Sequence, residues 1–180
     1  MNRPITVVLG LTFLLAVSFG VQAQALKDRA AKLKPFLPAA PAGWSNTKDE
    51  VIAQDSAMTG REIGVKRTYQ KDKAVEEIVI VHIGIEPGGK PLYGARLVDD
   101  PEQAAKDKLE GVPYTLGEAL GQKAATRKFR NALRSRDEHT VFHKLPNGMM
   151  AEYVVWTLPP ATLEPFKAKV DYKKLGALKP

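Results

Sequence analysis

The stretch VEEIVIVHIGI, residues 75–85, decides the fold of this chain. Valine and isoleucine fill both alternating sets of positions, and β-branched residues of this kind favour strands. A strand that is apolar on both of its faces lies inside a sheet and is covered on both sides. We therefore expect residues 75–85 to form a central strand, with the rest of the fold arranged around it.

Further strands are expected in pairs that are joined by short turns. The segment REIGVKRTYQ (61–70) has apolar residues on one face and is connected to the central strand by the polar turn KDKA. The segment HTVFHKLPNGMMAEYVVW (139–156) contains two more strands around the turn LPNGM. A weaker pattern over 114–129 predicts two short extended pieces around Gly117 and Gly121.

Three helical segments are expected. The first covers residues 25–34 and is limited by the proline that follows it. The second begins after Asp100, an N-cap followed by proline and glutamine, and stops near Gly111. The third begins after Thr162 and ends at Gly176, with an apolar stripe along one side. The residues of that stripe are Leu163, Phe166, Val170 and Leu175.

These elements define the expected fold class. Hairpins beside separate helices indicate an α+β arrangement. We expect one domain over residues 24–180: a mainly antiparallel sheet of about four to six strands built from hairpins, packed with two or three helices. A chain of 180 residues fits a single domain. It contains no cysteine, so no disulfide stabilises it.

The N-terminus is typical of a secretory signal peptide. Arg3 supplies the positive charge, and an uncharged apolar stretch covers residues 5–19. Small residues then allow cleavage after Ala23 or Ala25. An uncleaved membrane anchor is the alternative, because the apolar run approaches the length needed to span a bilayer. We expect residues 1–23 to be a signal peptide, no stable transmembrane segment after its cleavage, and a periplasmic or secreted protein.

The chain is basic, with a formal net charge of +7 at pH 7. Such a surplus favours acidic partners and also keeps a small protein soluble. We expect no nucleic acid as a partner of an exported protein.

Two of the three histidines, His139 and His143, lie four residues apart in an expected strand. With a two-residue turn at 146–147, both are predicted on a mixed face together with Glu152, opposite the core face. Four strand residues span about 13 Å, whereas zinc–nitrogen bonds are about 2.0–2.1 Å long, so the two imidazoles cannot share one metal. We therefore expect no metal site. A site made from His143, Glu152 and His82 is the alternative left open.

Two short motifs resemble catalytic motifs, but each lacks a feature that the chemistry requires. GIEPGGKP (84–91) matches most of a phosphate-binding loop, but Pro91 stands where a hydroxyl should bind magnesium. SNTK (45–48) has the Ser-x-x-Lys spacing of β-lactamases and penicillin-binding proteins, but their partner motifs are absent. We predict no catalytic residue and no cofactor.

The most distinctive charge feature is QKAATRKFRNALRSR, residues 122–136. It contains six positive charges and no acid, and arginine can bind phosphate or carboxylate with two parallel hydrogen bonds. An alternative is a solvated sheet edge that is kept basic to discourage edge pairing. The candidate anion-binding residues are Lys123, Arg127, Lys128, Arg130, Arg134 and Arg136.

The segment LPAAPAGW (37–44) follows the first expected helix, and its prolines hold the chain extended until Trp44, which we expect to be buried. An exported head followed by this segment resembles the start of small, uncharacterised periplasmic proteins of Gram-negative bacteria, whose mature chains open with Leu-Pro-x-x-Pro-x-Gly-Trp. The resemblance implies a compact periplasmic α+β domain and carries no catalytic residue across.

Two functions follow from these observations. The first is an exported accessory or binding protein that engages an anionic protein, glycan or lipid head group through one face of its sheet or its basic stretch. The second is a small hydrolase or metal-dependent enzyme centred on four residues. Those residues are His82, His139, His143 and Glu152. No catalytic constellation is complete, which favours the first function.

Overall fold

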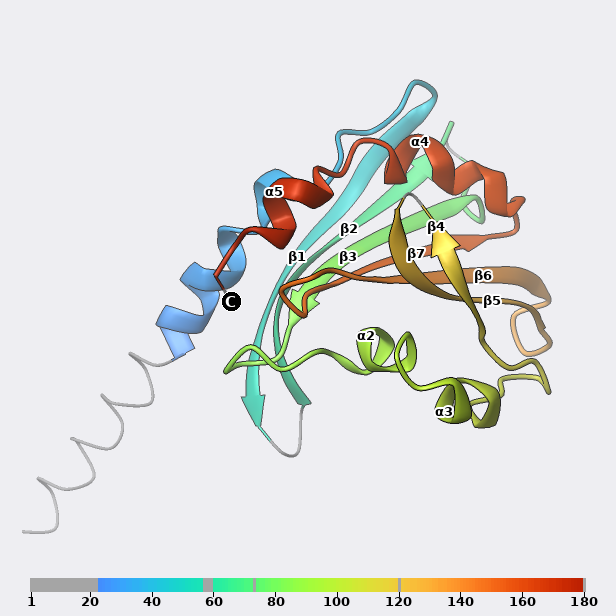
Figure 1. The fold of residues 1–180 in the computed structure, drawn as a ribbon. Coiled ribbons are helices and arrows are strands. Elements are labelled where there is room, and N and C mark those ends of the chain that lie inside the picture. The colour runs from blue at the N-terminus through green and yellow to red at the C-terminus, as the bar shows by residue number, and fades with distance from the viewer. Residues whose placement is uncertain (1–22, 57–59, 73, 120, 180) are drawn as a thin grey trace, which may run out of the picture.

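The computed structural model describes residues 23–56, 60–72, 74–119 and 121–179, and within them seven strands form one antiparallel sheet (Figure 1). The order across the sheet is β1-β2-β3-β7-β6-β5-β4. The strands are β1 (Trp44–Ser56), β2 (Gly60–Lys71), β3 (Ile78–Ile85), β4 (Thr115–Ala119), β5 (Gln122–Asn131), β6 (Arg136–Lys144) and β7 (Met150–Trp156). The α+β class with an antiparallel sheet is confirmed, and the expected count of four to six strands is wrong.

The helices are short and lie on both faces of the sheet (Figure 1). The helical elements are a helix over residues 23–31, η1 (Lys34–Phe36), α2 (Tyr93–Leu97), α3 (Pro101–Lys106), η2 (Pro160–Leu163), α4 (Glu164–Lys167) and α5 (Tyr172–Gly176). The N-terminal helix, α4 and α5 cover one face, which we call the first face. Helices α2 and α3 cover part of the opposite, second face. The described residues thus hold about five α-helices, against the two or three expected.

Each face has its own apolar core. On the first face, residues of the N-terminal helix, β2, β3, β7 and the C-terminal helices pack together, with Phe166 in edge-to-face contact with Tyr69 at 4.8 Å. On the second face, α2 packs on Phe142 of β6. Gly94 of α2 allows this close approach, because a Cβ there would lie 2.5 Å from the Phe142 ring. The molecule is therefore a three-layer arrangement with the sheet in the middle.

Strand β3 is central, as expected from residues 75–85. It pairs with β2 on one side and β7 on the other. Val79, Val81 and Ile83 are fully buried on the first face. The predicted strand at 61–70 corresponds to β2, so the β2–β3 hairpin is confirmed.

Strand β1 is not predicted from the sequence. It is an edge strand of 13 residues with mostly exposed side chains, so it lacks the apolar alternation that identifies a half-buried strand. Ion pairs join it to β2: Asp49 contacts Arg67 at 2.6 Å, and Glu50 contacts Lys66 at 2.9 Å. The first of these pairs explains why an arginine interrupts the apolar stripe of β2.

The turn between β6 and β7 differs from the expected two-residue turn. The amide of Leu145 donates to the carbonyl of Met149 at 2.9 Å, which leaves three residues in the loop. Gly148 occupies the left-handed region at φ +83°, as such a loop requires. The register therefore shifts by one residue, and a shift of one moves every side chain to the other face. His143 is opposite Ala151, and His139 is opposite Val155.

The helix that was expected after Thr162 is broken into η2, α4 and α5. Asp171 caps α5 by accepting a hydrogen bond from the amide of Lys174 at 2.9 Å. The apolar stripe is confirmed, because its four residues are all buried. The helix after Asp100 ends at Lys106 and not near Gly111, and α2 is not among the helices expected from the sequence.

Residues 1–22 of the predicted signal peptide lie outside the described residues. In the part of the chain that is described, no helix has the length and apolar character to cross a membrane. Trp44 begins β1 and is half-buried, with its ring 5.1 Å from that of Phe166, so it is less enclosed than expected.

Candidate functional site

The six candidate cations do not form one continuous patch. Residues 122–131 form strand β5, and alternate side chains of a strand point to opposite faces. The register places Lys128 and Arg130 on the first face, while Lys123 and Arg127 lie on the second. Arg134 lies in the turn that follows, and Arg136 begins β6. The basic stretch is thus divided between two faces and a turn.

Arg127 is a structural residue. Its guanidinium lies 4.0 Å from the centre of the Tyr114 ring and 3.4 Å from the carboxylate of Asp107. Its side chain is only 10% exposed. A stacked and paired arginine at this position fixes the chain before β4 against the sheet. It does not offer its charge to a partner in solution.

The turn between β5 and β6 carries the exposed part of the basic stretch. We call residues 130–136 the hairpin tip. Arg130 lies 3.3 Å from Asp137, and Arg136 lies 3.0 Å from Glu138 and 3.4 Å above the Trp156 ring. Arg134 has no acidic partner within the described part of the chain, and neither has Lys128, which lies two residues before the tip.

The tip also exposes an apolar side chain. Leu133 is 97% exposed, the highest value among the large apolar residues of the described chain. It lies between Arg130 and Arg134 in a tight turn, where Ser135 has a φ of +50°. The hairpin tip therefore exposes one leucine that Arg130 and Arg134 flank in the sequence.

The three histidines are separated by the sheet. His139 and His143 lie on the first face, in the register of Val155 and Ala151, and not on the mixed face expected for them. His82 lies on the second face opposite Glu152. The proposed catalytic grouping of four residues is therefore not brought together. Within the described ranges, no group of three or more histidine, aspartate or glutamate side chains is arranged to hold a metal ion.

His143 is fully buried beneath α5. Its ring lies 5.6 Å from the rings of both Tyr153 and Tyr172. Neither ring nitrogen has a hydrogen-bond partner among the described residues. Burial, with a smaller contribution from the charge of Lys167, lowers the pKa of His143 to about 4. The ring is therefore neutral at physiological pH and acts as a packing element.

His82 is held between two carboxylates. Its Nδ1 lies 2.9 Å from Glu152, and its Nε2 contacts Glu62. Burial acts to lower the pKa of His82, but the hydrogen bonds to Glu152 and Glu62 outweigh it and raise the pKa to about 9. The ring is thus an imidazolium that donates to both carboxylates. We call these three residues the carboxylate–histidine cluster.

Sequence reasoning named His82 and Glu152 and missed Glu62. The available signal was a pair of glycines, Gly64 and Gly84, which are directly opposite in β2 and β3. A Cβ on Gly64 would lie 2.7 Å from the Glu62 carboxylate. The glycines therefore create the room in which Glu62 reaches His82.

The carboxylate–histidine cluster is poorly suited to general base catalysis. A base needs an unprotonated nitrogen within reach of the substrate proton. In the cluster, both ring nitrogens of His82 are engaged by Glu62 and Glu152, and the ring itself is buried. The cluster instead ties β2, β3 and β7 together on the second face.

Comparisons with known proteins add no relative. No family model matches the chain, and no curated protein or solved structure matches it either.

Proposed function

We propose that this chain is an exported, non-catalytic binding protein that docks onto an anionic lipid surface through its hairpin tip. The observation that carries the proposal is the fully exposed Leu133 between Arg130 and Arg134. Periplasmic or secreted localisation is part of the proposal and is supported by the signal-peptide pattern of residues 1–23.

The chemistry of the tip suits a lipid surface. A basic residue close to an anionic bilayer contributes roughly 1 kcal/mol of attraction. An apolar side chain gains further free energy when it enters the boundary between head groups and acyl chains. Lys128 and Arg134 supply charge that no described acid neutralises, and Leu133 supplies the apolar contact. A purely electrostatic partner such as an acidic glycan would not use the leucine.

The enzymatic alternative has less support. It requires His82, His139, His143 and Glu152 to act together, and the sheet separates the first and last of these from the other two. His82 is occupied by two carboxylates, and neither ring nitrogen of His143 has a hydrogen-bond partner among the described residues. A binding role agrees better with these side chains.

Vesicle binding tests the proposal. The mature protein is mixed with vesicles of phosphatidylglycerol or of phosphatidylcholine, and the bound fraction is measured by sedimentation. We expect binding to the anionic vesicles only, and its loss at high salt, since the screening length shrinks from about 10 Å at 0.1 M to about 3 Å at 1 M. The triple change Lys128→Gln, Arg130→Gln, Arg134→Gln should weaken binding at least about tenfold. The single change Leu133→Ser should also weaken binding, but by a smaller factor.

A matched control removes the same charge elsewhere. Lys90, Lys108 and Lys173 are exposed and have no side-chain partner among the described residues. Changing these three to Gln should leave vesicle binding within about twofold, because none of them belongs to strand β5 or to the hairpin tip. Equal weakening by both triples would show that only net charge matters. Binding to soluble polyanions without binding to vesicles would indicate an acidic protein or glycan as the partner and overturn the lipid proposal.

A further inference from the structure

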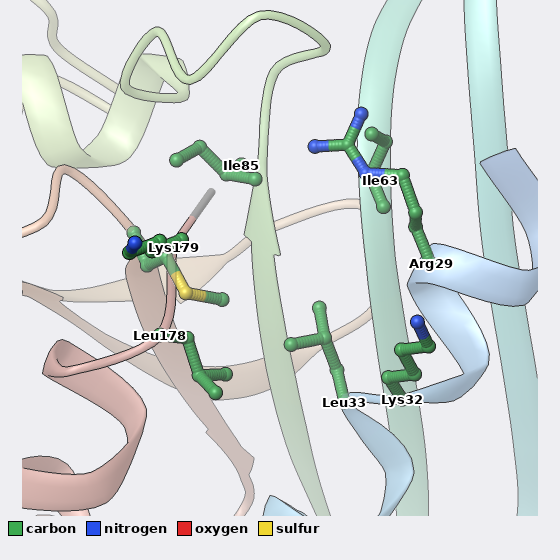
Figure 2. Close-up of a pocket in the computed structure, with 8 residues that line it drawn as sticks. Arg29, Lys32, Leu33, Ile63, Ile85, Leu178 and Lys179 are labelled. Atoms are coloured by element: carbon green, nitrogen blue, oxygen red, sulfur yellow. The ribbon is translucent and has the colours of Figure 1, made fainter.

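A second candidate binding site lies far from the hairpin tip. A pocket of about 210 Å³ opens between the N-terminal helix and the C-terminal tail, above the ends of β2 and β3 (Figure 2). Figure 2 shows Arg29, Lys32 and Leu33 on one side of the pocket and Leu178 and Lys179 on the other. Figure 1 places the N-terminal helix and the hairpin tip at opposite ends of the molecule. We call this space the terminal pocket.

The inner wall of the terminal pocket is apolar. Ile63 of β2 and Ile85 of β3 are direct cross-strand partners at its base. Leu33 and Met149 complete the base, and all four side chains are at most 6% exposed in the folded chain. A surface of this kind favours an aliphatic chain over a polar ligand, because an aliphatic chain that binds there removes its own apolar area from water.

The side wall is held in place by the turn between β6 and β7. The side-chain amide of Asn147 donates to the carbonyl of Leu178 at 3.0 Å and to that of Leu175 at 2.9 Å. These bonds fix the C-terminal tail opposite the N-terminal helix. The terminal pocket is therefore a built feature that depends on specific polar contacts.

The mouth of the pocket is cationic. Arg29, Lys32 and Lys179 are exposed and line it together. None of the three has a hydrogen bond or ion pair from its side chain within the described residues. Asp28, the nearest acid along the helix, accepts a hydrogen bond from Gln24 at 2.8 Å instead. Three unneutralised positive charges thus surround the entrance to an apolar space.

We propose that the terminal pocket binds a single-chain amphiphile with an anionic head group. The aliphatic chain lies on the base formed by Leu33, Ile63, Ile85 and Met149, and the head group meets the three cations. A cavity of about 150 Å³ holds one benzene molecule, so 210 Å³ accommodates roughly eight carbons of a chain. The head group is a carboxylate or a phosphate, either of which accepts hydrogen bonds from arginine and lysine.

Calorimetry with four small probes tests the proposal on the mature chain. Decanoate and decyl phosphate carry the anionic head and the chain, decanol lacks the charge, and inorganic phosphate lacks the chain. All four are used as monomers, without vesicles, so binding from a bilayer does not enter the result. We expect both anionic amphiphiles to bind, decanol to bind at least about tenfold more weakly, and phosphate not to bind. A tenfold change corresponds to about 1.4 kcal/mol.

The cations are then tested directly. The triple change Arg29→Gln, Lys32→Gln, Lys179→Gln should weaken decanoate binding about tenfold, because each exposed ion pair contributes modestly and three act together. The control is again Lys90, Lys108 and Lys173 changed to Gln, for which we expect less than a twofold effect. An unchanged melting temperature for both triples shows that the fold is intact, since all six residues are exposed.

Four results would overturn the proposal: no binding of either anionic amphiphile, equal binding of decanol and decanoate, binding of phosphate as strong as that of decanoate, or equal weakening by the two triples. The proposal does not depend on the docking role of the hairpin tip. The pocket triple leaves Lys128, Arg130, Leu133 and Arg134 unchanged, so vesicle binding should persist in it. Each proposal can therefore fail without the other.

Discussion

His143 is a histidine that the folded chain keeps neutral. Its pKa of about 4 lies below the usual 6.5, so the unfolded chain takes up a proton at a higher pH than the folded chain does. The contribution of His143 to stability is complete above pH 6.5 and is lost as the pH falls through 6.5 toward 4. The loss amounts to roughly 3 kcal/mol.

The substitution His143→Phe should remove this loss. We expect the free energy of unfolding in urea to fall less steeply between pH 7 and pH 4 in the variant than in the wild type. Other groups, such as His139, whose pKa burial also lowers, titrate in both proteins and cancel in the comparison. Parallel curves for the two proteins would contradict the assignment.

The pKa of His82 is shifted in the opposite direction. Its pKa of about 9 lies above the usual 6.5, so the folded chain holds the proton more tightly. The stabilisation is complete below pH 6.5 and is lost as the pH rises through 9, by an amount on the order of 3 kcal/mol. Nuclear magnetic resonance of the ring protons should give a titration midpoint near 9 for His82. A titration midpoint near 6.5 would contradict this prediction.

Glu62→Gln provides the control for His82. It removes the charge at Nε2 and leaves the hydrogen bond to Glu152 at Nδ1 in place. The midpoint of His82 should therefore move down, while that of His139 should stay where it is, because His139 lies on the opposite face.

Among the elements, the loop between β6 and β7 joins the sheet to the C-terminal helix. The Asn147 side chain donates to the carbonyl of Leu175 at 2.9 Å and to that of Leu178 at 3.0 Å, so it ties the end of α5 and the tail after it to this loop. Asn147→Ala should lower the free energy of unfolding by about 1–3 kcal/mol, because it removes both of these hydrogen bonds and a third, which the Asn147 Oδ1 accepts from the amide of Met149 at 3.2 Å. Denaturant unfolding measures the change. Asn46→Ala is the control, since its single bond to Asp49 is exposed, and it should have little effect.

Several elements could be predicted because their pattern is local. The β2–β3 hairpin follows from alternating and continuous apolar residues, and α3 follows from the Asp100 cap. Strand β1 was missed because an edge strand exposes most of its side chains and needs no apolar alternation. The predicted register between β6 and β7 was wrong, because the sequence LPNGM permits loops of two or three residues. That one residue decides on which face His139 and His143 lie.

The candidate sites, too, could be predicted only as far as local sequence patterns allow. The charges of residues 122–136 were visible in the sequence, but their division between faces depends on strand alternation, and the role of Arg127 depends on Tyr114 and Asp107. The terminal pocket has no local signal at all. Its cations, Arg29 and Lys179, come from opposite ends of the chain and meet only through packing.

For the whole molecule, the signal-peptide prediction can be tested by mass. Protein from the periplasm should have an intact mass that corresponds to a chain starting at Gln24 or Leu26. Either start leaves the core unchanged, because the first buried apolar residue of the N-terminal helix is Ala30. A full-length mass in the membrane fraction would favour an uncleaved anchor.

The strand order has a consequence for how the molecule forms. Strands β1 to β3 and strands β4 to β7 are two meanders, and the β3–β7 pairing, from Ile78 with Trp156 to Gly84 with Met150, is the seam between them. Each meander closes only short loops, whereas the seam must close a long one and carries the larger entropic cost. Seam closure should therefore limit the folding rate.

In stopped-flow experiments, Val155→Ala in the seam should slow folding, whereas Val65→Ala, equally buried in β2, should mainly speed unfolding. The speed of folding and the lifetime of the folded state are then controlled by different parts of the same sheet.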